Sequence, residues 1–374
     1  MDTNEVKKFN IFDEIVENKK LREEGKFIGI PYYEIYKRFG EDFPVIEKGH
    51  QGMLTASSGA GKTHWWIEML LFRVWLFITK LKKEGKEAGF IPIYKIALLE
   101  NTQKEFEYRL LARILAHLSK QVFPAKMLKG RDKFLIPNEI LEKYRDEATI
   151  ILDEIMSWCT VVTSITNPTG LYKWARKQSE LHGTHHWKED TFNGEKVKLY
   201  DRYVPFNEKE HVIFIVDNAN NITEEKGAET QHLAIRKWYR DYGRLQITKH
   251  WQWTLINIHQ QASDTEKLEF NQGRSITAKL KPSAAGLGNN KEVQRDCHFI
   301  WGLFNPSKYE IENYCGYNIK LLKNYFRSLL ILKQNDGNAD VEYPFFFHGG
   351  ASIMNELPKP DKIGDYNKIL NYYK

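Results

Sequence analysis

The sequence contains few cysteines, and their positions exclude a disulfide-stabilised fold. Its 374 residues include three, Cys159, Cys297 and Cys315, which are too scattered to form a disulfide framework. No two of them have the spacing of zinc ligands. These absences favour a reducing compartment, and we expect the protein in the cytoplasm.

Long apolar runs and a strong charge of one sign are also lacking. The segment 69–78 comes closest to a membrane span, but it is short and contains Arg73. Residues 1–20 contain no apolar stretch typical of a secretory signal. Lys and Arg number 55 against 49 acidic residues, and the net charge of +6 permits a nucleic-acid partner without requiring one. We therefore expect no membrane partner.

The stretch LTASSGAGKTHWW, residues 54–66, has the composition of a phosphate-binding loop. Such a loop needs backbone N–H groups facing anionic oxygens, a lysine for the terminal phosphates and a hydroxyl for Mg²⁺. Two glycines give the backbone its freedom, the Lys-Thr pair supplies both side chains, and an apolar helix follows with its N-terminus towards the phosphates. A glycine-rich turn with a chance Lys-Thr pair is the alternative. The predicted nucleotide-binding residues are Ala56, Ser57, Ser58, Gly59, Ala60, Gly61, Lys62, Thr63 and His64.

Two details of this stretch need an explanation. The small residue Ala56 occupies the position where such loops have their first glycine, and we expect a small side chain to suffice there. His64 and Trp65 are expected to serve mainly in helix packing, with lining of the nucleotide pocket as the alternative.

A carboxylate at the end of a neighbouring strand is needed to position Mg²⁺. Asp153-Glu154 and Asp217 both follow apolar residues. The apolar residues around Asp153 keep a helical spacing, whereas 212–216 is a β-branched and aromatic run typical of a buried strand. We therefore predict Asp217, with Thr63, as the metal-binding pair.

Two further polar residues end predicted strands and are candidates for catalysis. Glu100 ends YKIALLE, and the carboxyl ends of parallel strands face the ligand crevice, so it could activate a water molecule. The alternative for Glu100 is that it is only an acidic residue near the N-terminus of the next helix. Gln260 or Gln261, at the end of TLINIHQQ, could sense the terminal phosphate, and a plain surface glutamine is the alternative.

The order of predicted elements indicates an α/β protein. Strands are expected at 47–55, in the segment ending at Glu100, and at 159–165, 211–218, 253–261, 297–304 and 328–337. Helices are expected at about 5–20, 63–83, 102–120, 138–158, 170–183 and 234–245. This alternation favours a mostly parallel central sheet flanked by helices, with a charged hairpin insertion near 187–206.

The motifs together resemble those of the RecA-like P-loop NTPases, and in detail the ATPase domain of DnaB-like replicative helicases. FIGIPYYEIYKRFG and IEKGHQGMLTASSGAGKT resemble the start of that domain, in a family that also tolerates alanine at the first loop position. ALLENTQKEFEYRLLARILA is similar to its catalytic-glutamate strand and following helix. VIFIVDNANNI, NIHQQ, GNNKEVQRDCHFIWGLF and LILKQNDG resemble its later motifs, and the resemblance covers about residues 27–350.

The sequence departs from the family at three points. We expect no primase-binding domain before residue 27, and the hairpin is additional. Asn335 stands where the family has an arginine finger. Lys333 matches the basic residue before it and is the candidate to act on a neighbouring subunit, so the predicted catalytic set is Glu100, Lys62, Gln260 and Lys333.

The segment 262–292 is the candidate for nucleic-acid binding, with a solvated surface loop as the alternative. Its basic residues are Lys267, Arg274, Lys279, Lys281 and Lys291, set among Gly, Ser and Asn as in a loop that follows a phosphate backbone. The triplet His182, His185 and His186 has no nearby cysteine, and we do not expect it to bind metal.

The resemblance implies an ATP-dependent and Mg²⁺-dependent helicase or translocase that acts on single-stranded DNA in replication. We expect a homo-oligomeric ring, with a hexamer among its forms, and replication proteins as candidate partners in a phage or mobile-element setting. The main alternative is a recombinase-like or accessory DNA-binding ATPase that does not unwind DNA, and a non-enzymatic nucleotide-binding module is the third. The expected divisions are an arm at 1–26, an ATPase domain at 27–357 and a tail at 358–374.

Overall fold

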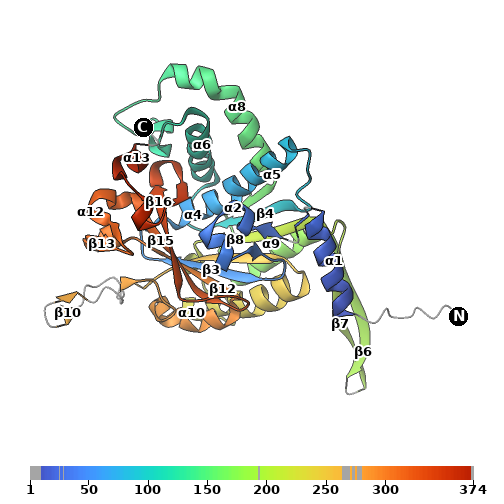
Figure 1. Ribbon diagram of the computed structural model, residues 1–374. Coiled ribbons are helices and arrows are strands. Elements are labelled where there is room, and N and C mark those ends of the chain that lie inside the picture. The colour runs from blue at the N-terminus through green and yellow to red at the C-terminus, as the bar shows by residue number, and fades with distance from the viewer. Residues whose placement is uncertain are drawn as a thin grey trace.

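The computed structural model describes residues 10–24, 26–27, 29–192, 194–262, 270–271, 274–275 and 280–371. Within these ranges the molecule is built around a nine-stranded sheet with the strand order β17-β16-β15-β12-β3-β9-β8-β4-β5. Helices cover both faces of this sheet (Figure 1). The expected α/β architecture is thereby confirmed.

Six neighbouring strands of the sheet are parallel and three at one side are antiparallel. Parallel pairing joins β12, β3, β9, β8, β4 and β5, and antiparallel pairing adds β15, β16 and β17. The strands in chain order are β3 (Gln51–Ala56), β4 (Ile91–Leu98), β5 (Cys159–Val162), β8 (Glu210–Asp217), β9 (Thr254–Gln260), β12 (Phe299–Phe304), β15 (Phe326–Gln334), β16 (Val341–His348) and β17 (Ile353–Glu356). The last strand predicted from the sequence corresponds to β15, so β16 and β17 are a correction.

Alternate residues of the central strands enter two separate cores, which explains their almost wholly apolar sequences. Ile213 and Ile215 of β8 face one core, and Phe214 and Val216 face the other. The first core is covered by α4 (Lys62–Trp66), the π-helix η1 (Ile67–Phe72), α5 (Arg73–Lys83), α6 (Gln103–Ser119) and α8 (Asn138–Ser157). The second is covered by α9 (Pro168–Ser179), α10 (Gln231–Lys237) and the π-helix η3 (Trp238–His250).

The remaining elements are short or peripheral. Near the N-terminus are α1 (Ile11–Glu23), β1 (Ile30–Pro31), α2 (Tyr32–Ile35), α3 (Arg38–Asp42) and β2 (Val45–Ile46). The middle adds α7 (Ala125–Leu128), β6 (Gly183–Phe192), β7 (Glu195–Pro205), η2 (Ala219–Asn221), β10 (Phe270–Asn271), β11 (Arg274–Ser275) and η5 (Ala285–Asp296). The C-terminal part adds η6 (Pro306–Tyr309), β13 (Asn313–Tyr314), β14 (Tyr317–Asn318), α12 (Ile319–Leu322), η7 (Lys323–Tyr325), η8 (Gly349–Ala351), η9 (Pro360–Lys362) and α13 (Tyr366–Leu370).

The N-terminal helix α3 is held by the last strand of the sheet. The Glu356 carboxylate accepts hydrogen bonds from the backbone N–H groups of Lys37, at 2.9 Å, and Phe39, at 2.7 Å. These N–H groups lie at the start of a helix, where no carbonyl of the same helix can accept them. The Asp42 carbonyl accepts a further hydrogen bond from the side chain of Gln334, at 3.0 Å. Residues some 300 positions apart thus hold both ends of α3.

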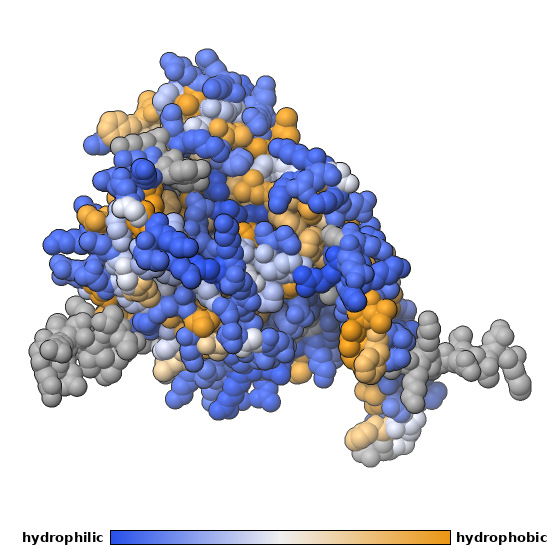
Figure 2. Space-filling model, in the orientation of Figure 1, coloured by the Kyte–Doolittle hydropathy of each residue, from blue (hydrophilic) through white to orange (hydrophobic). Residues whose placement is uncertain are grey.

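The predicted insertion is a long antiparallel hairpin of β6 and β7, which begins before residue 187. It projects from the body beside α1 (Figure 1), and Figure 2 shows apolar surface in this region. Phe192 of the hairpin and Phe12 of α1 are 69% and 70% exposed. In the described part of the chain, no helix combines the length and the apolar character needed to cross a membrane.

Candidate nucleotide site

The predicted phosphate-binding loop connects the end of β3 to the start of α4. Gly59 and Gly61 have φ values of 74° and 105°, a conformation that glycine adopts at little cost. A Cβ atom on Gly61 would lie 2.6 Å from the Phe347 ring. The Lys62 ammonium lies over the loop, 3.4 Å from the Ala56 carbonyl oxygen and 3.3 Å from that of Ser57. The loop therefore has the backbone shape and the cation that a phosphate site requires.

Thr63 and Asp217 meet beside this loop. The Thr63 hydroxyl donates to Asp217 Oδ2 at 2.9 Å, and the Trp66 indole N–H donates to the same oxygen at 2.9 Å. Burial raises the pKa of Asp217, while the hydrogen bonds from Trp66 and Thr63 oppose that rise. Mg²⁺ prefers hard oxygen ligands and commonly binds through one or two carboxylates together with phosphate oxygens. The hydroxyl and carboxylate fit this ion, which would neutralise charge on phosphate oxygens when bound.

Glu100 lies at the same edge of the sheet, two residues beyond β4. Leu98, the last residue of β4, pairs with Asp217, so Glu100 follows the strand next to the predicted metal ligand. Its side chain is exposed, and Asn218 Nδ2 donates to Glu100 Oε2 at 3.4 Å. The negative charge of Glu100 also contributes to the raised pKa of Asp217. A base at this position lies close enough to the predicted metal ligand to affect its pKa.

The two candidate glutamines have different surroundings. Gln261 is buried, and its amide donates to the Thr55 hydroxyl at 2.8 Å and the Ser283 carbonyl at 3.1 Å. Gln260 is partly exposed and pairs with Ala56 at the end of β3. Both glutamines adjoin the phosphate loop, because the Gln261 backbone N–H donates to the Ala56 carbonyl at 3.0 Å. The sensing role of Gln260 stays a prediction.

Asn220, in η2, connects β9 to the segment after Asp217. Its Oδ1 accepts from the Gln260 backbone N–H at 2.5 Å, and its Nδ2 lies 3.4 Å from the Gln260 carbonyl. The Asn220 backbone N–H donates to Asn218 Oδ1 at 3.1 Å. Because Asn218 also contacts Glu100, hydrogen bonds join Gln260 to Glu100. Neither asparagine was a predicted site residue, although both lie in the motif VIFIVDNANNI.

Sequence reasoning also missed two basic residues that hold the loop from the C-terminal half. Arg327, only 1% exposed, donates from Nε to the Ala60 carbonyl at 2.6 Å, and its guanidinium lies 4.2 Å from the Phe347 ring centroid. Burial lowers the pKa of Arg327 to about 9. Lys308 Nζ lies 3.2 Å from the Ser58 carbonyl. An arginine at the start of an apolar strand, YFRSLLIL, is the signal that could have revealed Arg327.

Two predicted residues, His64 and Lys333, have their contacts outside this cluster. His64 Nδ1 lies 2.8 Å from the Ser352 hydroxyl, and burial lowers the pKa of His64 to about 3. Lys333 pairs with Ile300, which in turn pairs with Met53 near the start of β3, so it lies towards the opposite edge of the sheet. The Lys333 ammonium donates to the carbonyls of Gln294, at 3.1 Å, and Cys297, at 2.6 Å. Direct roles of His64 and Lys333 at phosphate stay predictions.

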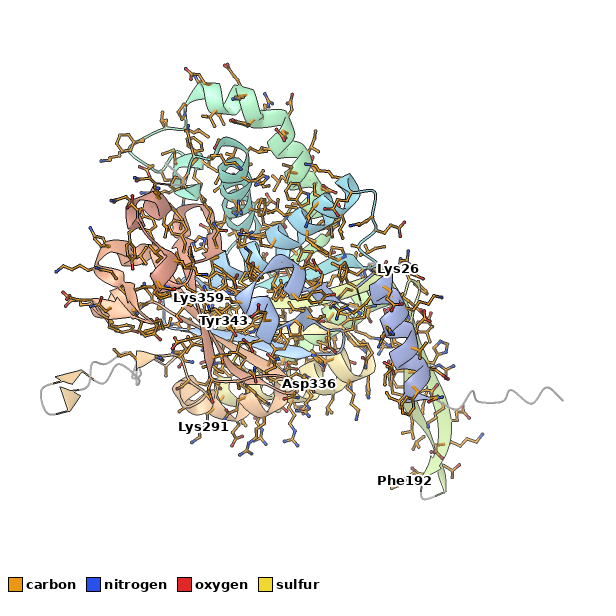
Figure 3. All side chains as sticks on the ribbon, viewed as in Figure 1. Lys26, Phe192, Lys291, Asp336, Tyr343 and Lys359 are labelled. Carbon is orange, nitrogen blue, oxygen red and sulfur yellow. The ribbon has the colours of Figure 1, made fainter. Side chains whose placement is uncertain are left out.

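The structure describes only some of the residues that are predicted to bind nucleic acid. Lys267 and Lys279 lie outside the described residues, and Arg274 is described only in the backbone of β11. Lys281 pairs with Glu342, with 2.8 Å between Nζ and Oε1. Lys291 is exposed on η5 and is labelled in Figure 3. Binding by these residues stays a prediction.

The carboxylates and histidines that were not expected to bind metal lie in a helix or contact other side chains of the protein. Asp153 and Glu154 lie in α8, as the helical spacing predicts, and Glu154 Oε2 accepts from the Trp75 indole N–H at 2.7 Å. His182 Nδ1 lies 2.7 Å from Glu210 Oε2, and His185 Nε2 lies 2.7 Å from the Ser179 hydroxyl. No group of three His, Cys, Asp or Glu residues suited to a metal ion occurs in the described ranges.

Comparison with known proteins identifies the fold through structure and not through sequence. The sequence matches no protein-family model and no curated protein. The solved ATPase domain of G40P is similar with a TM-score of 0.63 at 14% identity, over 93% of this chain and 99% of that chain. A DnaB-like replicative helicase, solved with attention to its interactions with primase, has a TM-score of 0.61 at 14% identity, over 94% of this chain and 67% of that chain. This chain therefore has the RecA-like α/β fold of DnaB-like helicase ATPase domains.

Proposed function

We propose that the protein is an ATP-hydrolysing motor of the DnaB-like type that acts on single-stranded DNA. The observation that carries this proposal is the meeting of Lys62, Thr63, Asp217 and Glu100 at one edge of the sheet. The supporting contact is the 2.9 Å hydrogen bond between Thr63 and Asp217, which brings two magnesium-type ligands together at the phosphate loop. The fold similarity supports the same assignment.

Each residue has one task in this proposal. Lys62 and the backbone N–H groups of the loop hold the phosphates, and Thr63 and Asp217 hold Mg²⁺. Glu100 accepts a proton from the water molecule whose oxygen bonds to the terminal phosphorus, as the bond from that phosphorus to the departing ADP breaks. Gln260 senses the terminal phosphate, and the bonds through Asn220 and Asn218 connect it to Glu100.

The second candidate is an accessory or recombinase-like DNA-binding ATPase without unwinding activity. Two observations favour it: Asn335 replaces the expected arginine finger, and the Lys333 ammonium is bound to carbonyls of its own chain. An arginine finger contributes about 10³- to 10⁵-fold to turnover where it is present. We therefore expect slow hydrolysis for this chain alone.

Self-association into a ring is part of the leading proposal. The apolar side chains Ile11, Phe12, Ile15 and Val16 of α1 are each more than half exposed, which is unusual for a helix that has no further partner. A groove of about 670 Å³ between α5, α6 and α8 is lined by apolar residues, with three lysines and three glutamates at its polar positions. We infer that α1 of one copy docks in the groove of the next.

The function is tested by measuring ATP hydrolysis with and without single-stranded DNA. Wild type should hydrolyse ATP faster with DNA, and Lys62→Ala and Glu100→Gln should each lower turnover by about 100-fold or more. Glu100→Gln should still bind ATP, because the glutamate acts on water and not on phosphate. ATP binding without turnover in wild type would replace the motor with a nucleotide-binding module.

A strand-displacement assay separates the two DNA-dependent candidates. The leading proposal predicts ATP-dependent separation of a forked duplex by wild type and none by Lys62→Ala. DNA-stimulated hydrolysis without any strand separation would favour the accessory ATPase.

A further inference from the structure

A cleft rich in arginine lies on the second-core side of the sheet, between the π-helix η3 and η5. Its volume is about 450 Å³. Four of its lining residues are basic and two are acidic: Arg236, Arg240, Arg244, Arg295, Glu292 and Asp296. None of them takes part in the candidate nucleotide site.

The arginines lie on one side of the continuous helix formed by α10 and η3, because the other side is buried. Arg236, Arg240 and Arg244 recur at every fourth residue and are exposed, whereas Trp238 and Tyr239 between them are fully buried in the second core. The helix thus presents a row of guanidinium groups to the cleft, which η5 closes on its other side with Arg295.

The charges of this cleft are not balanced within the chain. Glu292 lies 3.8 Å from Arg236, and Arg244 donates to the backbone carbonyl of Arg295 at 2.7 Å. Two carboxylates therefore face four guanidinium groups. Exposed Lys291 on η5 adds a further positive charge near the cleft. Figure 3 shows Lys291 among long nitrogen-tipped side chains on this side of the molecule.

We propose that this arginine cleft binds the phosphate backbone of single-stranded nucleic acid. Guanidinium groups bind phosphate through paired hydrogen bonds, and a groove of positive charge follows a backbone without selecting its sequence. The proposal rests on the proposed motor function and names where the strand contacts the folded domain.

The cleft is connected to the segment already predicted to bind DNA. The Ala262 N–H donates to the Gly286 carbonyl at 2.8 Å, so the end of β9 meets the start of η5. The opposite end of η5 forms the cleft through Glu292, Arg295 and Asp296. A strand held near the start of η5 can therefore continue along this helix into the row of arginines, and the cleft extends the contact beyond the loop.

The test measures binding of a fluorescent oligo(dT) by anisotropy over a range of salt concentrations. In the variant R236A/R240A/R244A, the affinity should fall at least 10-fold at low salt. The slope of log K against log[salt] should become shallower by about 2, since each phosphate contact on a single strand contributes about 0.7. The Lys versions of the same three changes should retain most of the slope, because the charges remain.

The control variant is R131A/K133A/R145A, which loses the same charge from exposed positions near α7 and α8. It should bind like wild type, and both variants should keep the DNA-independent ATPase rate. If R236A/R240A/R244A binds with the affinity and salt slope of wild type, the proposal that the cleft binds nucleic acid is overturned. The motor proposal is not affected by that result. Loss of self-association with an unchanged slope would also overturn the cleft proposal, in favour of a contact between copies. Absence of oligo(dT) binding by wild type would overturn both proposals.

Discussion

Asp217 is a single carboxylate with two opposed requirements. It is 1% exposed, and burial raises its pKa, yet a metal ligand has to be ionised. Because the folded protein holds this proton more tightly than the unfolded chain, the protonated form stabilises the fold. That stabilisation is fully present below the unfolded pKa and is lost as the pH rises through the raised pKa of the folded state. Ionised Asp217 therefore reduces stability at neutral pH.

The change Asp217→Asn should remove both the destabilising buried charge and the metal site. We expect a higher melting temperature than wild type at neutral pH without ligand, and a difference that shrinks as the pH is lowered. ATP turnover with Mg²⁺ should fall by about 100-fold or more. Thermal melts across pH and a phosphate-release assay measure both effects. A variant that melts lower than wild type at neutral pH would contradict the argument from burial.

Residues of the candidate site were predictable where the local sequence alone indicates their chemistry. Lys62, Thr63 and Asp217 follow from loop composition and from the difference between helical and strand spacing around Asp153 and Asp217. Arg327 was not predictable, because its role depends on β15 bringing it to the Ala60 carbonyl from 267 positions away. The contacts of the Gln261 side chain with Thr55 and Ser283 were likewise not predictable, because they depend on how distant segments pack together.

The elements that carry the phosphate loop are joined by a buried ion cluster. Glu68 of η1 is fully buried and accepts from Arg113 of α6, with 3.1 Å between Nη2 and Oε1, and from Arg73 of α5 at 2.7 Å. The helix after the phosphate loop is thereby fixed to the helix after Glu100. A buried charge that loses its partner costs about 3–5 kcal/mol.

The change Glu68→Ala should therefore lower the free energy of unfolding by about 3–5 kcal/mol. The double variant Glu68→Ala with Arg113→Leu should recover part of this loss, because it no longer buries an unpaired guanidinium. Urea denaturation followed by tryptophan fluorescence provides the comparison. Additive losses in the double variant would show that the two side chains do not depend on each other.

Long elements with a clear period were predictable and short or interrupted ones were not. Helices α6 and α8 and strands β8 and β9 lie within about two residues of their expected bounds. Strand β16 was missed, and it contains Pro344, a residue that sequence patterns place outside sheets. The π-helical segments η1 and η3 were predicted as plain helix, because their apolar spacing is close to that of an α-helix.

At the scale of the whole molecule, the exposed apolar face of α1 predicts self-association. The double change Phe12→Asp with Ile15→Asp should weaken assembly at least 10-fold, since burial of each such side chain contributes about 1.5–3 kcal/mol. Lys20→Asp, on the same helix and exposed, is the control and should assemble normally. Mass photometry at several concentrations measures the change. Equal assembly of the double variant and wild type would exclude α1 as the contact.

The closure of α3 by Glu356 bears on how the chain is synthesised. The backbone N–H groups of Lys37 and Phe39 have their acceptor 319 and 317 residues later, and Asp42 meets Gln334 after a separation of 292. Such distant pairings form slowly, because the loop between them has to close first. On the ribosome, the segment from β1 to β2 has to wait until β17 has emerged. We therefore expect its aromatic side chains to stay exposed during translation, and to become fully buried only as synthesis of the sheet is completed.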